Sequence, residues 1–238
     1  ALGVFASLSL GCLALQGLDW NLVLSPLRKL PVYTVALALG IFLLSNLARA
    51  YRWKLLFLNE QISVYRLFLV ENMALGINNL LPIRIAGEAA QYTILILRDK
   101  ISHGTAMATL GMTRVMDIWA STLLLATGLL FVQGTRQLAQ YAVAASIFSL
   151  LLLATIRFLA WGSQGLPIME KVPLLNAFAS SVADLEHRKT LLMASLALST
   201  CQWVLLGISG WIVALGMDIS LSPPQVVVVV LATIFFAT

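Results

Sequence analysis

Five charged side chains interrupt apolar stretches of this 238-residue sequence, and these five residues could do chemistry. They are Glu71, Arg84, Glu88, Arg114 and Asp117. Arg84 and Glu88 are four residues apart, and Arg114 and Asp117 are three apart, so each pair would share one face of a helix. Charges inside a bilayer are costly and normally pair while facing the interior of a helical bundle. Because arginine matches phosphate with two parallel hydrogen bonds, the set predicts a site for a lipid headgroup or an ion.

Amide side chains extend this candidate site. Asn78, Asn79 and Gln91 fall in the same short region between residues 71 and 91, which is otherwise apolar. A second interpretation stays open beside the first. The charges could be two mutually satisfied ion pairs that fix how the helices dock, without contacting a ligand.

The charge sum limits the kind of headgroup. Arg84, Glu88, Arg114 and Asp117 sum to zero, and an ionised Glu71 would make the set −1. A zwitterionic or cationic headgroup therefore fits as well as an anionic phosphate. Arg49 and Arg52 could add positive charge, but with Trp53 we predict that they anchor the chain at the membrane interface, where long basic side chains snorkel and tryptophans gather.

The composition places these residues in a membrane protein. Apolar residues make up 60% of the chain and charged residues 11%, against roughly 45–50% and 25% in soluble domains. This excludes a soluble protein, and it excludes a disordered one, which would be poor in apolar residues. The net charge of +5 indicates cytoplasmic loops rather than a nucleic-acid partner.

Apolar runs predict an all-α integral membrane protein with a single transmembrane domain, folded as a polytopic helical bundle. A span needs about 20 mostly apolar residues. An amphipathic segment over 162–189 is predicted on the cytoplasmic face or packed under the bundle. The predicted spans are 1–17, 31–48, 104–131, 137–160 and 190–216, with an incomplete one over 225–238.

Basic residues set the orientation and require a hairpin. Ten of the 15 Lys and Arg residues fall in three loop regions, 49–66, 98–100 and 157–189, which the positive-inside rule places in the cytoplasm together with the N-terminus of the chain. Residues 63–97 must then enter the membrane and return. Pro82 breaks the helix between the two arms. We therefore predict a re-entrant hairpin of broken helices, a feature that marks binding sites in transporters.

Three segments in chain order resemble the lysylphosphatidylglycerol synthase transmembrane region, a flippase-like membrane family. They read RAYRWKLL at 49–56, NNLLPIRIAGE at 78–88 and RVMD at 114–117, with weaker similarity at Gln202-Trp203 and Ala214-Leu215-Gly216. The resemblance covers most of the chain. It implies a multi-span bundle that translocates lipids, such as aminoacylated phosphatidylglycerol, in a prokaryotic-type cytoplasmic (inner) membrane.

Two departures from the family pattern limit what is carried over. The sequence has no soluble aminoacyl-transferase domain, so synthase activity is not expected. A second motif, rich in Pro and Gly and ending in Glu, would follow Thr238 and is not in the sequence. It would enter from the outer side, which is the layout of an inverted repeat. We expect this chain to hold one half of such a site and the start of the other.

The leading hypothesis is therefore a flippase-like protein whose partners are membrane lipids. The competing hypothesis is a non-transporting accessory or scaffold subunit of a larger membrane complex, and a homo-oligomer is also open. An enzyme using Glu71 or Glu88 as acid or base would lack a readable nucleophile, so we expect no enzyme activity. We expect no cofactor and no metal site, because His103 and His187 have no ligand partners at metal-binding spacing.

Overall fold

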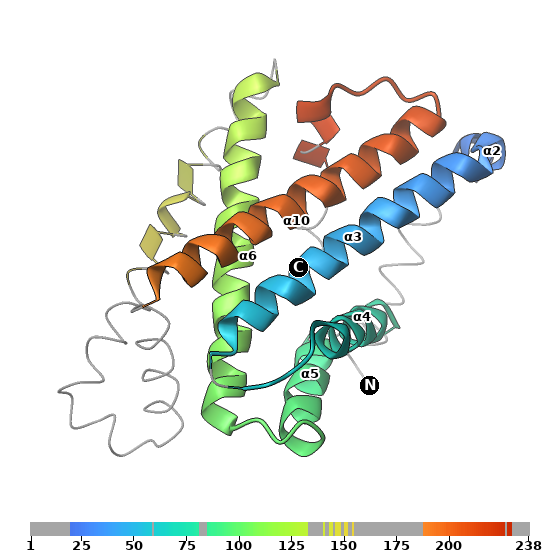
Figure 1. Cartoon of the computed structure of the whole chain (residues 1–238). Coiled ribbons are helices and arrows are strands. Elements are labelled where there is room, and N and C mark those ends of the chain that lie inside the picture. The colour runs from blue at the N-terminus through green and yellow to red at the C-terminus, as the bar shows by residue number, and fades with distance from the viewer. Residues whose placement is uncertain are drawn as a thin grey trace, which may run out of the picture.

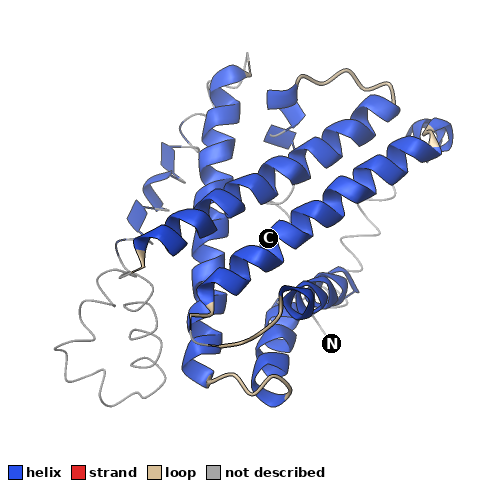
Figure 2. Cartoon of the chain, in the orientation of Figure 1, coloured by secondary structure: helices blue, strands red, loops and turns tan. Residues whose placement is uncertain are grey.

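The fold is helical throughout the part of the chain that the computed structural model describes (Figure 2). That part comprises residues 20–58, 60–80, 85–132, 140, 143–144, 146–148, 150–151, 154, 188–226 and 228–229. No strand occurs in these ranges. The main helices are α2 (Trp20–Lys29), α3 (Val32–Leu56), α4 (Val64–Leu80), α5 (Ile85–Leu97), α6 (His103–Phe131) and α10 (Lys189–Gly216).

Helices α3 and α10 form the most extensive helix pair and run side by side in opposite directions (Figure 1). Two hydrogen bonds cross between them. The hydroxyl of Ser45 donates to the carbonyl of Gln202 at 3.0 Å, and that of Ser209 donates to the carbonyl of Ala38 at 2.9 Å. Side chains at this contact are small or polar, which lets the backbones approach closely, as in membrane helix pairs. The buried positions on α10 are Ser195, Ser199, Gln202, Gly207 and Ser209, and those on α3 are Thr34, Ala38, Ser45, Asn46 and Ala50 together with the larger Arg52, Trp53 and Leu56 near its end.

Large apolar side chains point away from this helix pair. On α3, Val32 is 83% exposed and Leu37 is 55% exposed, whereas Thr34 is 5% exposed. The distribution is the reverse of that in a soluble protein, where leucine and valine are among the residues most often buried. Both α3 and α10 are long and apolar enough to cross a membrane.

Helices α4 and α5 pack against each other as an antiparallel hairpin. Three hydrogen bonds follow one another along the hairpin, between Arg66 and Asp99, Glu71 and Gln91, and Asn78 and Gly87. A Cβ on Gly87 would lie 2.5 Å from the Asn78 side-chain oxygen and 2.6 Å from the Ala74 carbonyl oxygen. Glycine is therefore needed where the start of α5 meets α4.

The helix bounds can be compared with the predicted segments. Helix α3 continues to Leu56 through residues that we predicted to be a loop after 48, because their side chains contact other helices. Helices α6 and α10 lie where we predicted spans over 104–131 and 190–216, and α4 and α5 occupy the predicted hairpin over 63–97. The re-entrance of that hairpin and the inverted repeat stay predictions.

Several predicted segments lie outside the described residues. These are the span over 1–17, most of the span over 137–160, the amphipathic segment up to 187, and most of the span over 225–238. Residues 81–84, with Pro82 and Arg84, also lie outside the described residues.

Two glycines on the hairpin give a matched test of its packing. Gly87→Ala should destabilise the protein by about 1–3 kcal/mol, because the new methyl group meets backbone and must push the helices apart. Gly76→Ala is the control, since a Cβ there meets nothing within 4 Å and alanine favours a helix by about 1 kcal/mol over glycine. Unfolding of the detergent-solubilised protein measures both. Equal stability of the two variants would contradict the close approach at Gly87.

Candidate functional site

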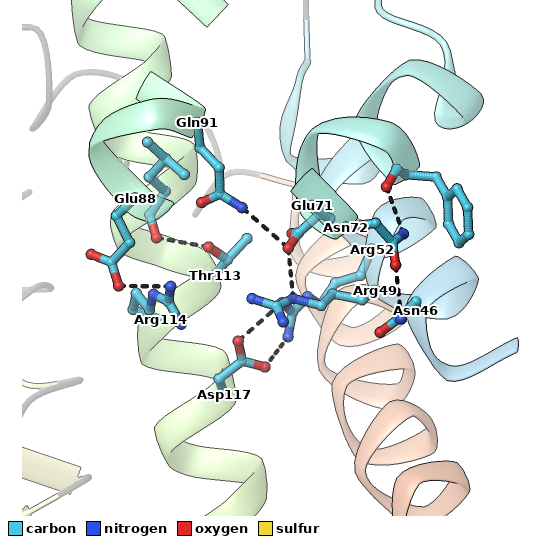
Figure 3. A network of polar contacts seen from close by, with 12 residues as sticks. Asn46, Arg49, Arg52, Glu71, Asn72, Glu88, Gln91, Thr113, Arg114 and Asp117 are labelled. Carbon is cyan, nitrogen blue, oxygen red and sulfur yellow. Dashed lines mark hydrogen bonds and ion pairs between the residues drawn. The ribbon is translucent and has the colours of Figure 1, made fainter. Parts of the chain in front are cut away.

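Four helices bring six charged side chains together as three ion pairs (Figure 3). Each pair joins two different helices, and the three pairs differ in how far they are exposed. The pairs are Arg52 with Asp117, Arg49 with Glu71, and Arg114 with Glu88.

The Arg52–Asp117 pair joins α3 to α6 and is buried. The guanidinium of Arg52 donates from Nη1 to Asp117 Oδ1 and from Nη2 to Asp117 Oδ2, the latter at 3.2 Å. Nη1 also donates to the Ser199 hydroxyl on α10 at 2.7 Å. The Arg52 side chain is 0% exposed. One guanidinium therefore fixes three helices, and its two-pronged geometry is the kind that gives the strongest charged hydrogen bonds.

The Arg49–Glu71 pair joins α3 to the hairpin. The Arg49 Nε atom lies 2.9 Å from Glu71 Oε2, and the Glu71 side chain is 3% exposed. The Gln91 amide, on α5, donates to the same carboxylate oxygen at 3.2 Å. One turn along α3 from Arg49, the Asn46 amide donates to Asn72 Oδ1 at 3.1 Å. These contacts hold both arms of the hairpin against α3.

The Arg114–Glu88 pair joins α6 to α5 and is the open one. Arg114 Nη2 lies 2.6 Å from Glu88 Oε1, and the two side chains are 41% and 42% exposed. Glu88 stands in the first turn of α5, where the helix dipole favours a negative charge. Asn78 supports this turn, because its Oδ1 accepts the Gly87 backbone N–H at 2.8 Å and so satisfies a donor that the helix start leaves free.

The three pairs behave as one electrostatic cluster. Besides its partner Glu71, Arg49 interacts electrostatically with Asp117 and Glu88, and Arg114 interacts with Asp117 in addition to Glu88. The six charges sum to zero. A change of charge at the exposed pair would therefore be felt at the buried ones.

The structure brings most of the predicted site residues together but pairs them differently. Glu88 pairs with Arg114 on α6, which lies far from it in the sequence, and Arg84 lies outside the described residues. Asp117 pairs with Arg52 rather than with Arg114. Asn79 is exposed near the end of α4.

Arg52 and Trp53, which we predicted as interfacial anchors, lie inside the bundle. Both residues are 0% exposed, so their side chains contact protein and do not snorkel on its surface. Arg49 is paired with Glu71 and has 14% of its side chain exposed. A signal for this was present in the sequence, because Ser45, Arg49 and Arg52 are spaced to lie on one helical face.

No group of three His, Cys, Asp or Glu residues that could hold a metal ion occurs in the described ranges. The His103 ring lies against Tyr92, with 2.7 Å between Nδ1 and the phenol oxygen. The chemistry that the cluster offers is therefore that of paired arginines and carboxylates.

Comparison with known proteins gives one kind of match. A family model described as the lysylphosphatidylglycerol synthase TM region matches residues 1–238. Among curated proteins and among solved structures, nothing matches.

Removing one partner of the buried Arg52–Asp117 pair should destabilise the protein far more than replacing both partners. Asp117→Ala should destabilise the protein by about 3–5 kcal/mol, because it leaves the Arg52 charge buried without a partner. The double variant Arg52→Met, Asp117→Leu should recover most of that loss, since apolar residues of similar volume replace buried ion pairs well. Unfolding in detergent measures both, and a double variant no more stable than Asp117→Ala would contradict the pairing.

Breaking the exposed Arg114–Glu88 pair should have a small effect on the free energy of unfolding. Arg114→Gln should lower the free energy of unfolding by less than Asp117→Ala does, because about two-fifths of each side chain is exposed and the Glu88 carboxylate that is left stays accessible to other polar groups. The same unfolding assay compares it with Asp117→Ala. A loss at Arg114 as large as that at Asp117 would show that the Arg114–Glu88 pair is structural.

Proposed function

We propose that this chain, which belongs to the lysylphosphatidylglycerol synthase TM region family and is an integral membrane protein, is flippase-like and translocates a phospholipid across the bilayer. The site is the charge cluster. Asn78, Asn79, Arg84 and Glu88 on the hairpin, with Arg114 and Asp117 on α6 and Glu71 behind them, would line the path of the headgroup.

The observation that carries this proposal is the half-exposed Arg114–Glu88 pair. Its two partners are 41% and 42% exposed, whereas Arg52 is 0% exposed and Glu71 is 3% exposed. The exposed pair can exchange contacts with a ligand, and the buried pairs keep its two helices in place. A charged group that is open to a ligand between apolar helices suits a molecule with an apolar body and a charged head.

The depth of the pair supports the same proposal. Arg114 lies ten residues from Gly104, near the start of α6, which is about 15 Å along a helix axis. The hydrocarbon core of a bilayer is about 30 Å thick. With α6 crossing the membrane, Arg114 would lie near the midplane, where transporters place their substrate sites.

The proposal includes a topology. The hairpin of α4 and α5 is re-entrant with its tip in the membrane, and it forms one half of an inverted repeat. The basic residues at the ends of the hairpin, Arg66, Arg98 and Lys100, face the cytoplasm of a cell with a prokaryotic-type inner membrane, as does the N-terminus of the chain. We propose further that the protein is not an enzyme, that its partners are membrane lipids, and that it forms a homo-oligomer or part of a larger membrane complex.

A second candidate function has its own supporting observation. All six charges of the described cluster have a partner of opposite sign, which is what a purely structural set of ion pairs would show. The chain would then be a non-transporting accessory or scaffold subunit of a larger membrane complex.

A transport assay separates the two functions. Purified protein in vesicles of phosphatidylethanolamine and phosphatidylglycerol should translocate fluorescent lipid, measured by chemical quenching from outside. Arg114→Ala should lower the rate at least about tenfold, the effect of losing one charged hydrogen bond. The control is Arg66→Ala, which removes an ion pair with Asp99 outside the cluster and should keep the rate.

The outcomes are distinct. Translocation that is unchanged in Arg114→Ala would contradict the site, and its absence from the wild-type protein would favour the accessory function.

A further inference from the structure

We propose that Arg114 and Glu88 bind the headgroup by exchanging partners with it, so that Arg114 takes a phosphate and Glu88 takes an ammonium group. The ligand class is then a zwitterionic headgroup that carries both charges. This inference rests on the proposed lipid-binding function and names the chemistry of the same site.

The open ion pair is the starting point. Arg114 Nη2 and Glu88 Oε1 are 2.6 Å apart, yet about two-fifths of each side chain is exposed. A ligand can therefore approach either partner without unpacking the helices. The Glu88 carboxylate binds the guanidinium group that a phosphate would also bind. In the protein without a ligand, Glu88 therefore competes with the phosphate for Arg114.

Charge balance selects the ligand. The six charges of the described cluster sum to zero. A headgroup with only a phosphate would take Arg114 and leave Glu88 without its partner. A headgroup with a phosphate and an ammonium replaces one ion pair by two, and every charge keeps a partner of opposite sign.

The local structure lowers the cost of separating the pair. Glu88 stands in the first turn of α5 and keeps the favourable helix dipole after Arg114 has turned to the ligand. Asn78 holds that turn through the Gly87 N–H, so the carboxylate stays in place. The Arg114 guanidinium has five N–H donors, enough for two-pronged contact with a phosphate.

A rival exchange would admit an anionic headgroup. Arg84 precedes Glu88 by four residues, so it could take the carboxylate when a phosphate takes Arg114. The wild-type preference between lipids decides between the two exchanges.

The test measures lipid binding apart from transport. The full-length protein in detergent is titrated with phosphatidylethanolamine, which is zwitterionic, or phosphatidylglycerol, which is anionic, and bound lipid is counted by native mass spectrometry. The wild-type protein should prefer phosphatidylethanolamine. Glu88→Gln should weaken its binding about tenfold, because the ammonium loses its charged partner, and should strengthen binding of phosphatidylglycerol, because the competitor of the phosphate is gone.

Two further variants keep the result interpretable. Arg114→Gln should weaken both lipids alike, since both carry the phosphate. Asp99→Asn removes the partner of Arg66 on the same hairpin and should change neither, which controls for the loss of a carboxylate. Folding of each variant is checked by its unfolding midpoint.

Three results would overturn the inference: equal wild-type binding of the two lipids, a wild-type preference for phosphatidylglycerol, or parallel changes for both lipids in Glu88→Gln. If these occur while the wild-type protein still translocates lipid, the exchange is wrong and the proposed function stands. A wild-type protein that neither binds nor translocates either lipid contradicts both.

Discussion

The interaction on which the rest of this structure depends is the two-pronged contact between Arg52 and Asp117. In an apolar environment, a charged group is not solvated by water, so it is stabilised by a partner of opposite charge within the protein. Arg52 meets this need with Asp117 on α6 and Ser199 on α10. It thereby fixes α6 against the antiparallel pair of α3 and α10.

The exposure of the three paired arginines of the cluster rises from Arg52 through Arg49 to Arg114. The Arg52 side chain is 0% exposed, Arg49 is 14% exposed and Arg114 is 41% exposed. The buried pairs connect α3 to α6 and to α4, whereas the exposed pair connects the start of α5 to α6. The cluster therefore has two pairs that are largely buried and one pair that is open.

The helices were more predictable from the sequence than the pairing of their charges. Apolar runs and Pro82 were enough to predict helices close to α4, α5, α6 and α10, because these signals are local. The end of α3 was not predictable in this way, because we took the first charged residues after residue 48 as the start of a loop. The contacts of Arg52 with other helices explain why the helix continues to Leu56. The sequence also favoured partners three or four residues apart, but tertiary distance placed Glu88 beside Arg114 and Asp117 beside Arg52.

The first turn of α5 links the packing of the hairpin to the exposed Arg114–Glu88 pair. Gly87 lets the start of α5 approach α4 so closely that Asn78 can accept its backbone N–H. Glu88 is the next residue, so the Asn78 contact helps to place it. Its carboxylate lies against Arg114 (Figure 3). Further along the hairpin, the Glu71 carboxylate pairs with Arg49 and accepts a hydrogen bond from Gln91. These contacts hold both α4 and α5 against α3. The position of the exposed Glu88 carboxylate is therefore set by contacts among more buried residues, and the proposed exchange of its partner would leave those contacts in place.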